Sequence, residues 1–327
     1  MRSSFAPELD FTVAIPTYNG ENRLAEVLEK LQIQMGTESI RWEILIIDNN
    51  STDRTAEFVR QMQKNWTQSY PLRYTLETQQ GASFARLKAI GEAKGKWVGF
   101  LDDDTIPAEN WVVAAYQFGE KHPKVGAYGS QVRGAYEVKP PPNFEKIASF
   151  FAITERGSQP HLYEPKMKML PPSAGLVVLK QAWCESVPDK LFLSGRSARS
   201  ILNSEDLEVI LYIQNAGWEI WYNPEMEIYH KIPRDRLERD YLLYLMRSTG
   251  LARHYIRMLR FKTWQKPFVF PVGFGRDIYK AIRHFCKHRH HLDRDIVAAC
   301  ELEFLTSSII SPFYLWRESI KRWWISR

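Results

Sequence analysis

Short apolar runs alternate with amphipathic segments along the N-terminal third of the chain. The runs at 11–16, 42–48, 71–76 and 97–101 have the length and residue types of buried strands. Between them, apolar residues recur every three or four positions at 24–31, 51–62 and 81–94, which predicts helices. A further helix is expected from Pro107 to about Lys121. Strands that alternate with helices predict an α/β fold with a mainly parallel sheet flanked by helices.

The alternation becomes less regular after residue 122. We expect strands at 124–138, 173–179, 218–223 and 226–229, with a helix at 206–214. From residue 234 onward, apolar residues at helical spacing are interleaved with arginines, with a break at Pro267 and Pro271 and a second helix at about 276–284. We therefore expect a domain at 1–232, with a regularly alternating half at 1–122 and a less regular half at 123–232. Residues 233–327 form a basic, amphipathic helical C-terminal region.

The composition is that of a globular protein, and 327 residues are enough to bury a sizeable core. Three widely separated cysteines predict no disulfide framework and fit a reducing cytoplasm. The first strand begins within ten residues of Met1, so no signal peptide is expected. The most apolar segment, 304–316, contains Pro312 and is too short to cross a bilayer, so no spanning helix is expected.

Charge is distributed unevenly along the chain. The net charge is +6; residues 1–230 hold 24 basic and 29 acidic residues (−5), and residues 231–327 hold 20 and 9 (+11). The C-terminal charges accompany apolar side chains that could enter a lipid interface, namely Leu242, Leu245, Leu251, Trp316, Trp323 and Trp324. This favours an anionic membrane surface on the cytoplasmic face as a partner, and the alternative is an apolar face packed within the protein. Nucleic acid is not expected as a partner, because the chain has no recognised binding motif.

Three aspartates follow directly after the apolar strand at 97–101. Adjacent carboxylates repel each other, and this raises the pKa of each. A divalent cation removes that penalty, and carboxylate oxygens suit Mg²⁺ or Mn²⁺. Asp102 and Asp104 are therefore predicted to bind a metal ion or a sugar. The alternative is an acidic turn that caps the next helix.

Polar residues also follow the first two strands. Thr17 and Tyr18 come after the first, and Asp48 ends the second. Because the carboxyl ends of parallel strands meet at one edge of a sheet, these residues and Asp102 to Asp104 should lie along the same edge, where ligands bind.

Four motifs in this order resemble those of the family 2 glycosyltransferases. They are P-T-Y-N at 16–19, I-I-D-N-N-S-T-D at 46–53, F-L-D-D-D at 100–104 and S-E-D at 204–206. The resemblance extends over residues 10 to about 232 and implies the GT-A fold of nucleotide-diphospho-sugar transferases. It implies a nucleotide-binding half at about 1–122 and an acceptor half at 123–232. It also implies a hexosyltransferase-type enzyme of polysaccharide biosynthesis that inverts the sugar configuration and uses Mn²⁺ or Mg²⁺. The donor would be a nucleotide-diphosphate sugar, and the acceptor a hydroxyl of a saccharide or of a lipid-linked molecule.

The resemblance implies roles in donor binding for four residues. Thr17 would contribute to substrate binding, and the Tyr18 ring would stack on the base. The Asp48 carboxylate could accept a hydrogen bond from a ring N–H, which favours a UDP-sugar. Arg86 would contact the base or the diphosphate, although this chain has Ala85-Arg86-Leu87 where the family usually has Ala-Arg-Asn. The alternatives are a core aromatic at Tyr18, a helix cap at Asp48 and a surface arginine at 86.

Within the acidic triplet, the resemblance assigns Asp102 to the ribose or donor sugar and Asp104 to the metal ion. Asp103 occupies the middle position and would also contribute to substrate binding. His230 would complete the metal site, and its alternative is a hydrogen-bonded structural histidine.

Asp206 is the predicted catalytic base. Inverting transfer needs one carboxylate on the acceptor side to remove the hydroxyl proton, and the start of a helix favours the ionised form. Glu205 would orient the acceptor. The alternative is a pair of carboxylates that only caps the helix.

Two other functions are alternatives to glycosyl transfer. A sugar nucleotidyltransferase needs a Gly-rich, basic phosphate loop after the first strand, but residues 17–22 hold one glycine and no lysine. A non-catalytic scaffold of a membrane polysaccharide-assembly complex would not need carboxylates at every expected position.

Overall fold

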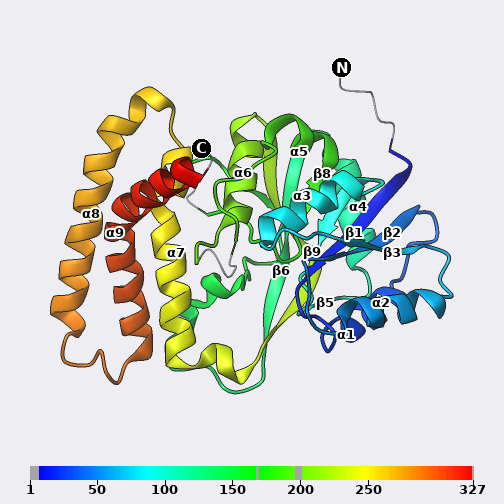
Figure 1. Ribbon diagram of the computed structural model, residues 1–327, viewed down its shortest axis with the longest axis horizontal. Coiled ribbons are helices and arrows are strands. Elements are labelled where there is room, and N and C mark those ends of the chain that lie inside the picture. The colour runs from blue at the N-terminus through cyan, green and yellow to red at the C-terminus, as the bar shows by residue number, and fades with distance from the viewer. Residues whose placement is uncertain (1–6, 167–168, 196–200, 326–327) are drawn as a thin grey trace. The chain divides into compact units, whose positions relative to one another are not determined.

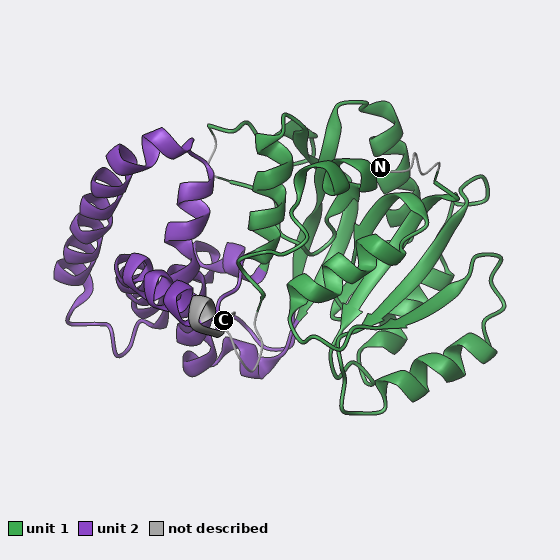
Figure 2. Ribbon diagram, turned by 45° about the horizontal axis from the view of Figure 1, so that its top comes forward, with its two compact units in different colours: residues 1–135, 152–198, 205–231 green, residues 136–151, 199–204, 232–327 purple. Residues whose placement is uncertain are grey.

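The computed structural model describes residues 7–166, 169–195 and 201–325. The chain forms two compact units (Figure 2). Unit 1 comprises residues 1–135, 152–198 and 205–231, and unit 2 comprises 136–151, 199–204 and 232–327. Each unit is described by itself.

Unit 1 is an α/β layer structure (Figure 1). Its strands are β1 (Leu9–Thr17), β2 (Trp42–Asp48), β3 (Leu72–Leu76), β4 (Gly95–Phe100), β5 (Thr105–Pro107), β6 (Val125–Tyr136), β7 (His161–Leu162), β8 (Val177–Leu179) and β9 (Glu219–Ile232). Its helices are α1 (Leu24–Gln32), α2 (Thr55–Lys64), α3 (Ala82–Glu92), α4 (Trp111–Lys121), α5 (Lys180–Ser186) and α6 (Glu205–Asn215).

The strands form one mixed sheet in the order β3-β2-β1-β4-β8-β6-β9-β5, with β7 paired to β9. β3, β2, β1 and β4 are parallel, because α1, α2 and α3 connect them in sequence and return the chain to the same end of the sheet. The strands of the predicted acceptor half pair antiparallel with their neighbours. The predicted α/β class with parallel strands in the nucleotide-binding half is confirmed.

The core of unit 1 lies on both faces of this sheet, because strand side chains alternate between faces. Phe11 lies on the face that α4 covers, with its ring edge-on to that of Trp111 and 6.0 Å between centroids. Gly99 permits this close packing, since a Cβ there would lie 2.7 Å from the Trp111 ring. Phe100 lies on the opposite face, 5.9 Å from the ring of Trp183 in α5.

Two predictions about the strands and helices of unit 1 are wrong. Pro107 does not begin a helix; it ends β5, which pairs with β9, and α4 begins at Trp111. The residues predicted as two short strands form one long strand, β9, which continues through Pro224. In both cases strand pairing in the tertiary structure overrides the local signal of a proline.

Unit 2 is mainly helical. Its long helices are α7 (Arg239–Leu259), α8 (Lys266–His288) and α9 (Ile296–Ile325), with short 3₁₀ turns at Phe144–Lys146, Ala148–Phe151, Arg234–Leu237 and Thr263–Gln265. α7 and α9 pack closely where Gly250 meets Ser307, because a Cβ on the glycine would lie 2.6 Å from that of the serine. Hydrogen bonds reinforce the contact, since Ser311 Oγ donates to the Leu251 carbonyl at 2.5 Å.

The prolines of unit 2 do not break its helices as the sequence predicted. Pro267 lies in the first turn of α8, where it leaves no hydrogen bond unmade, and Pro271 lies inside the same helix. α9 likewise continues through Pro312. The segment Ile296–Lys321 is therefore long and apolar enough to cross a membrane, by length and composition. In its most apolar part, 33% is buried within the protein. The expectation that the apolar segment 304–316 is too short to cross a bilayer is wrong, because the helix is longer than that segment. A buried helix of a soluble protein can have the same length and composition.

The apolar residues expected at a lipid interface separate into two groups. Leu242, Leu245 and Leu251 are buried, so their prediction as interfacial residues is wrong. Trp316 is exposed. The side chains of Trp323 and Trp324 lie outside the described residues.

We predict that Trp111→Ala destabilises unit 1 by about 3–5 kcal/mol. The ring is fully buried and its Nε1 donates to Ser130 Oγ at 3.0 Å, so truncation leaves a cavity and removes this hydrogen bond. Met35→Ala, at an exposed position of the same unit, should change the free energy of unfolding by no more than about 0.5 kcal/mol. Denaturant unfolding followed by circular dichroism measures both, and equal midpoints would contradict this account of the core.

Candidate functional site

All the residues predicted for the site lie in unit 1. β1 and β2 end side by side, with Thr17 paired to Asp48, and the Asn49 amide continues the ladder by donating to the Thr17 carbonyl at 2.8 Å. The Leu101 amide donates to the Ala14 carbonyl at 3.0 Å, so the acidic triplet follows at the same edge. The predicted alignment of these residues along the carboxyl edge of the sheet is confirmed.

The middle aspartate of the triplet anchors the loop that follows β1. Asp103 accepts hydrogen bonds from Arg23 Nε and Nη2, both at 2.9 Å, and from Thr17 Oγ1 at 2.5 Å. The charge of Asp103 raises the pKa of Arg23, chiefly through this hydrogen bond. Arg23 was not identified from the sequence; the available signal was a cation directly before α1, in the loop that follows the first strand.

Tyr18 lies on this anchored loop with its side chain open to solvent. The residue is 45% exposed, so the alternative of a core aromatic is wrong. Asn19 next to it has a positive φ of 53° and holds the loop to the β2–α2 connection, because its amide donates to Ser51 Oγ at 2.9 Å. Asn19 Oδ1 accepts a second bond from the Thr52 amide at 2.8 Å. The Tyr18 ring therefore projects from a backbone that is held on both sides.

Asp48 is buried at the end of β2 and is oriented by two hydrogen bonds. Its Oδ1 accepts from the Ser51 amide and its Oδ2 from the Tyr74 hydroxyl, each at 2.8 Å. Burial and this bond to Asp48 raise the pKa of Tyr74 to about 12, so the hydroxyl keeps its proton and remains a donor. The helix-cap alternative is wrong, because Asp53 accepts from the Thr55 amide at the start of α2 instead.

Arg86 is buried beneath the edge and pairs with two carboxylates. Its Nη1 lies 2.5 Å from Glu205 Oε1, and its Nη2 lies 3.5 Å from Asp102 Oδ1. Burial by itself would lower the pKa of Arg86, but the charges of Glu205, Asp102 and Asp206 outweigh it and raise the pKa. The surface-arginine alternative is wrong. The guanidinium links the acidic triplet to the start of α6, two segments far apart in the chain.

Asp104 and His230 face each other across the β5–β9 ladder. His230 Nε2 lies 3.6 Å from Asp104 Oδ1, and Thr105 pairs with His230 in the register. Burial raises the pKa of Asp102, and the negative charge of nearby Asp104 raises it further. The positive charge of Arg86 opposes this shift.

The side chains of Asp104 and His230 fit a divalent metal ion, because carboxylate and imidazole are ligands that Mn²⁺ accepts. A cation would also relieve the repulsion between Asp102 and Asp104. Within residues 7–166, 169–195 and 201–325, no group of three His, Cys, Asp or Glu side chains is placed to hold a metal ion. The remaining ligands would therefore have to come from substrate phosphates or water.

Asp206 lies in the first turn of α6 and is hydrogen-bonded to the segment 173–176, which precedes β8. Its Oδ2 accepts from the Ser173 amide at 3.0 Å and its Oδ1 from the Leu207 amide at 2.8 Å. The 173–176 segment is itself fixed to β4, because the Gly175 amide donates to the Phe100 carbonyl at 3.0 Å. Burial and the charge of Glu205 raise the pKa of Asp206 to about 6.

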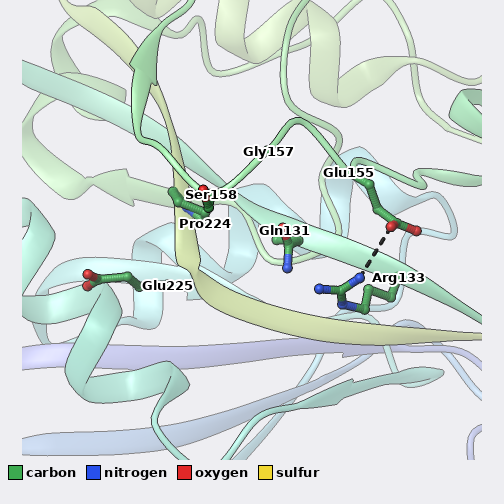
Figure 3. A pocket seen from close by; sticks show the side chains of 7 residues that line it. All are labelled: Gln131, Arg133, Glu155, Gly157, Ser158, Pro224 and Glu225. Carbon is green, nitrogen blue, oxygen red and sulfur yellow. Dashed lines mark hydrogen bonds and ion pairs between the residues drawn. The ribbon is translucent and has the colours of Figure 1, made fainter.

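A polar hollow of about 550 Å³ lies elsewhere in unit 1 (Figure 3). It is lined by Gln131, Arg133, Glu155, Gly157, Ser158, Pro224 and Glu225. Arg133 is bound to Glu155 at 3.2 Å and to Glu227 at 3.0 Å, so its charge is already neutralised. None of the residues predicted for the site lines this hollow, so it is separate from the carboxylate edge.

The chain is similar over part of its length to curated bacterial glycosyltransferases. It is 32% identical over 93 residues to the putative teichuronic acid biosynthesis glycosyltransferase TuaG of Bacillus subtilis, which is 28% of this chain and 35% of TuaG. It is 32% identical over 119 residues to the poly(ribitol-phosphate) beta-N-acetylglucosaminyltransferase TarS of Staphylococcus aureus, which is 36% of this chain and 20% of TarS. The matches thus span about a third or less of these relatives.

Solved structures show the same fold at low sequence identity. The mannosyltransferase PcManGT from Pyrobaculum calidifontis, solved with GDP-Man and Mn²⁺, has a TM-score of 0.59 and 16% identity, covering 95% of this chain and 90% of its own. TarS residues 1–349 of S. aureus, solved with UDP-GlcNAc, has a TM-score of 0.51 and 14% identity, covering 92% and 91%. The model of glycosyl transferase family 2 matches residues 12–175, half of the chain. The chain belongs to glycosyl transferase family 2 and has the GT-A fold.

Proposed function

We propose that this protein is an inverting, hexosyltransferase-type enzyme that moves a sugar from a nucleotide diphosphate to a hydroxyl of a saccharide or lipid-linked acceptor. The observation that supports this most directly is the Arg86 bridge between Asp102 and Glu205. It joins the aspartates suited to the donor side with the carboxylate pair suited to the acceptor side. A transferase needs the donor-side and acceptor-side carboxylates close together, so that the two substrates are held in contact for the reaction.

The nucleotide would bind at the ends of β1 and β2. The exposed Tyr18 ring offers a flat surface for stacking a base. Asp48 accepts one hydrogen bond on each oxygen and retains a lone pair on each for a ring N–H, which favours a uracil base and hence a UDP-sugar. Thr17 contributes indirectly, because its hydroxyl is bonded to Asp103 and fixes the backbone that carries Tyr18.

Asp104 and His230 would hold Mn²⁺ or Mg²⁺, with Asp102 facing the ribose or donor sugar. When bound, the metal ion supplies positive charge that stabilises the departing diphosphate. PcManGT, solved with Mn²⁺, supports a divalent ion on this fold. Asp102 and Asp104 bind and orient the donor, and Asp103 keeps the first loop in position through Arg23.

Asp206 would act as the base on the acceptor side. Its carboxylate removes the proton of the acceptor hydroxyl as the oxygen attacks the anomeric carbon from the face opposite the diphosphate, which leaves with the bonding electrons. A pKa of about 6 suits this role, because the group is ionised at neutral pH yet still basic enough to take the proton. Glu205 holds Arg86 and would orient the acceptor through the same helix start.

The relatives suggest which acceptors to test. TuaG is named for teichuronic acid biosynthesis and TarS for poly(ribitol-phosphate) glycosylation. We propose a role in polysaccharide biosynthesis at a cytoplasmic site, including the cytoplasmic face of the plasma membrane. A sugar nucleotidyltransferase is less favoured, because Arg23, the cation of the β1 loop, is held by two bonds to Asp103. A non-catalytic scaffold is less favoured, because the carboxylates remain in place and oriented.

Asp206→Asn should lower the turnover number by about 10²–10⁴-fold and leave the dissociation constant for the donor nearly unchanged. In the wild type, the base works only when ionised. Its pKa is raised to about 6, so activity should fall as the pH drops through about 6 instead of through 4. Transfer to a saccharide acceptor measured from pH 5 to 8 tests this, with the exposed Asp189→Asn as a control. Wild-type turnover in Asp206→Asn would show that another group is the base.

Asp104→Ala and His230→Gln should weaken binding of UDP in Mn²⁺ without affecting binding in chelator. The reason is that each substitution removes one of the two side chains that could hold the ion. Calorimetry with UDP, in Mn²⁺ and in EDTA, measures the difference. Equal affinity for UDP in the two conditions with the wild-type protein would refute the metal assignment.

Arg86→Met should destabilise unit 1 by about 3–5 kcal/mol, because it leaves Glu205 buried without its partner. Arg86→Met combined with Glu205→Met should recover most of that stability, since two apolar groups replace the pair. If Arg86 also positions the site, the double variant stays inactive although it is folded. Recovery of both stability and turnover would show that the bridge is only structural.

A further inference from the structure

Helix α8 in unit 2 exposes its large apolar side chains to solvent and buries small or charged ones. Its buried residues are small or charged: Gly273, Asp277 and Ala281. Phe268, Val272, Tyr279 and Ile282 are between 59% and 71% exposed. At about 100° per residue these four lie within an arc of about 80°, opposite the buried residues. We call them the outer face of α8.

Contacts with α7 fix this orientation of the helix. Asp277 Oδ2 lies 2.5 Å from Arg257 Nη2, and a Cβ on Gly273 would lie 2.7 Å from Arg257 Nη1. Arg257 of α7 thus packs on Gly273 and pairs with the buried Asp277. Helix α8 cannot rotate its outer face inward without losing both contacts. α8 also contacts α9, where the ring of the exposed Phe313 lies 6.1 Å from that of the half-buried Phe274.

A row of cations runs along one side of the outer face. Arg276, Lys280, Arg283 and Lys287 are exposed and follow helical spacing, so they form a basic flank next to the apolar stripe. Asp277 is the only acidic residue in α8, and it is buried against Arg257. The flank is therefore not neutralised by its own helix. An apolar stripe with aromatic residues beside a row of cations is the pattern of a helix that lies in the interface of an anionic bilayer.

We propose that α8 is an interfacial membrane-docking helix: its outer face enters the lipid interface while its basic flank binds anionic head groups. The charge of the flank selects an anionic bilayer over a second copy of the chain, because two copies of this face would bring like charges together. The helix lies along the surface without crossing it, since its inner face stays in contact with α7.

Flotation of the full-length protein with lipid vesicles tests the proposal. The protein should float with vesicles of phosphatidylcholine and phosphatidylglycerol at about 0.05 M salt and much less at about 0.5 M, where charges are screened. It should not float with phosphatidylcholine alone. Absence of flotation with anionic vesicles at low salt would overturn the proposal.

Two pairs of substitutions separate the apolar and the basic contributions. Phe268→Ser with Ile282→Ser, and Arg283→Glu with Lys287→Glu, should each lower partitioning into anionic vesicles at least about tenfold. The matched controls are Ile33→Ser with Met35→Ser, and Lys121→Glu with Lys124→Glu, at exposed positions of unit 1. These should leave partitioning unchanged. Because all eight side chains are exposed, melting temperatures should confirm that every variant folds.

Three further results would overturn the proposal. Control pairs that lower partitioning as much as the α8 pairs would place the contact elsewhere or make it nonspecific. Protein that stays in cell membranes after extraction with alkaline carbonate would indicate a spanning helix, for which α9 is the candidate. A dimer in light scattering that Phe268→Ser with Ile282→Ser dissociates would show that a second copy covers the outer face.

Discussion

The arrangement of the site depends on one buried guanidinium. Arg86 is closed off from solvent, and a buried cation is tolerated only where anions compensate it. Glu205 and Asp102 provide that compensation. This requirement draws the helix start that carries Asp206 toward the sheet edge that carries the triplet. The proximity of Glu205 then helps to raise the pKa of Asp206, so one charge balance sets both the geometry and the basicity of the proposed base.

The three consecutive aspartates have three different surroundings, although they are chemically identical in the sequence. Asp103 is neutralised by Arg23 and secures the loop that presents Tyr18. Asp102 is held by Arg86, and Asp104 lies against His230. A strand end turns its successive side chains in different directions, so each meets a different neighbour. The triplet therefore links the loop after β1, the start of α6 and the β5–β9 ladder within three consecutive residues.

Helix α8 of unit 2 differs from unit 1 in where its large apolar side chains lie. In unit 1 the large apolar side chains lie in the core, as with Trp111 and Phe11. In α8 the large side chains face outward, because the inner surface is occupied by the pairing of Asp277 with Arg257. Sequence periodicity alone identifies an amphipathic helix there but cannot say which side is covered. Leu242 and Leu245 show the same limit, since they were expected at an interface and are buried.

The sequence by itself determined the elements whose signals are local. The buried runs that became β1, β2 and β4, and the polar residues at their ends, follow from hydrophobic patterning and from the geometry of parallel strands. The tertiary structure alone decided the pairings between distant segments: Arg86 with Glu205, Asp103 with Arg23, and Pro107 in a strand that pairs with β9. The physical reason is that periodicity reports only the neighbours of a residue along its own helix or strand. Charge compensation and strand pairing depend instead on groups that approach each other only after the chain has folded.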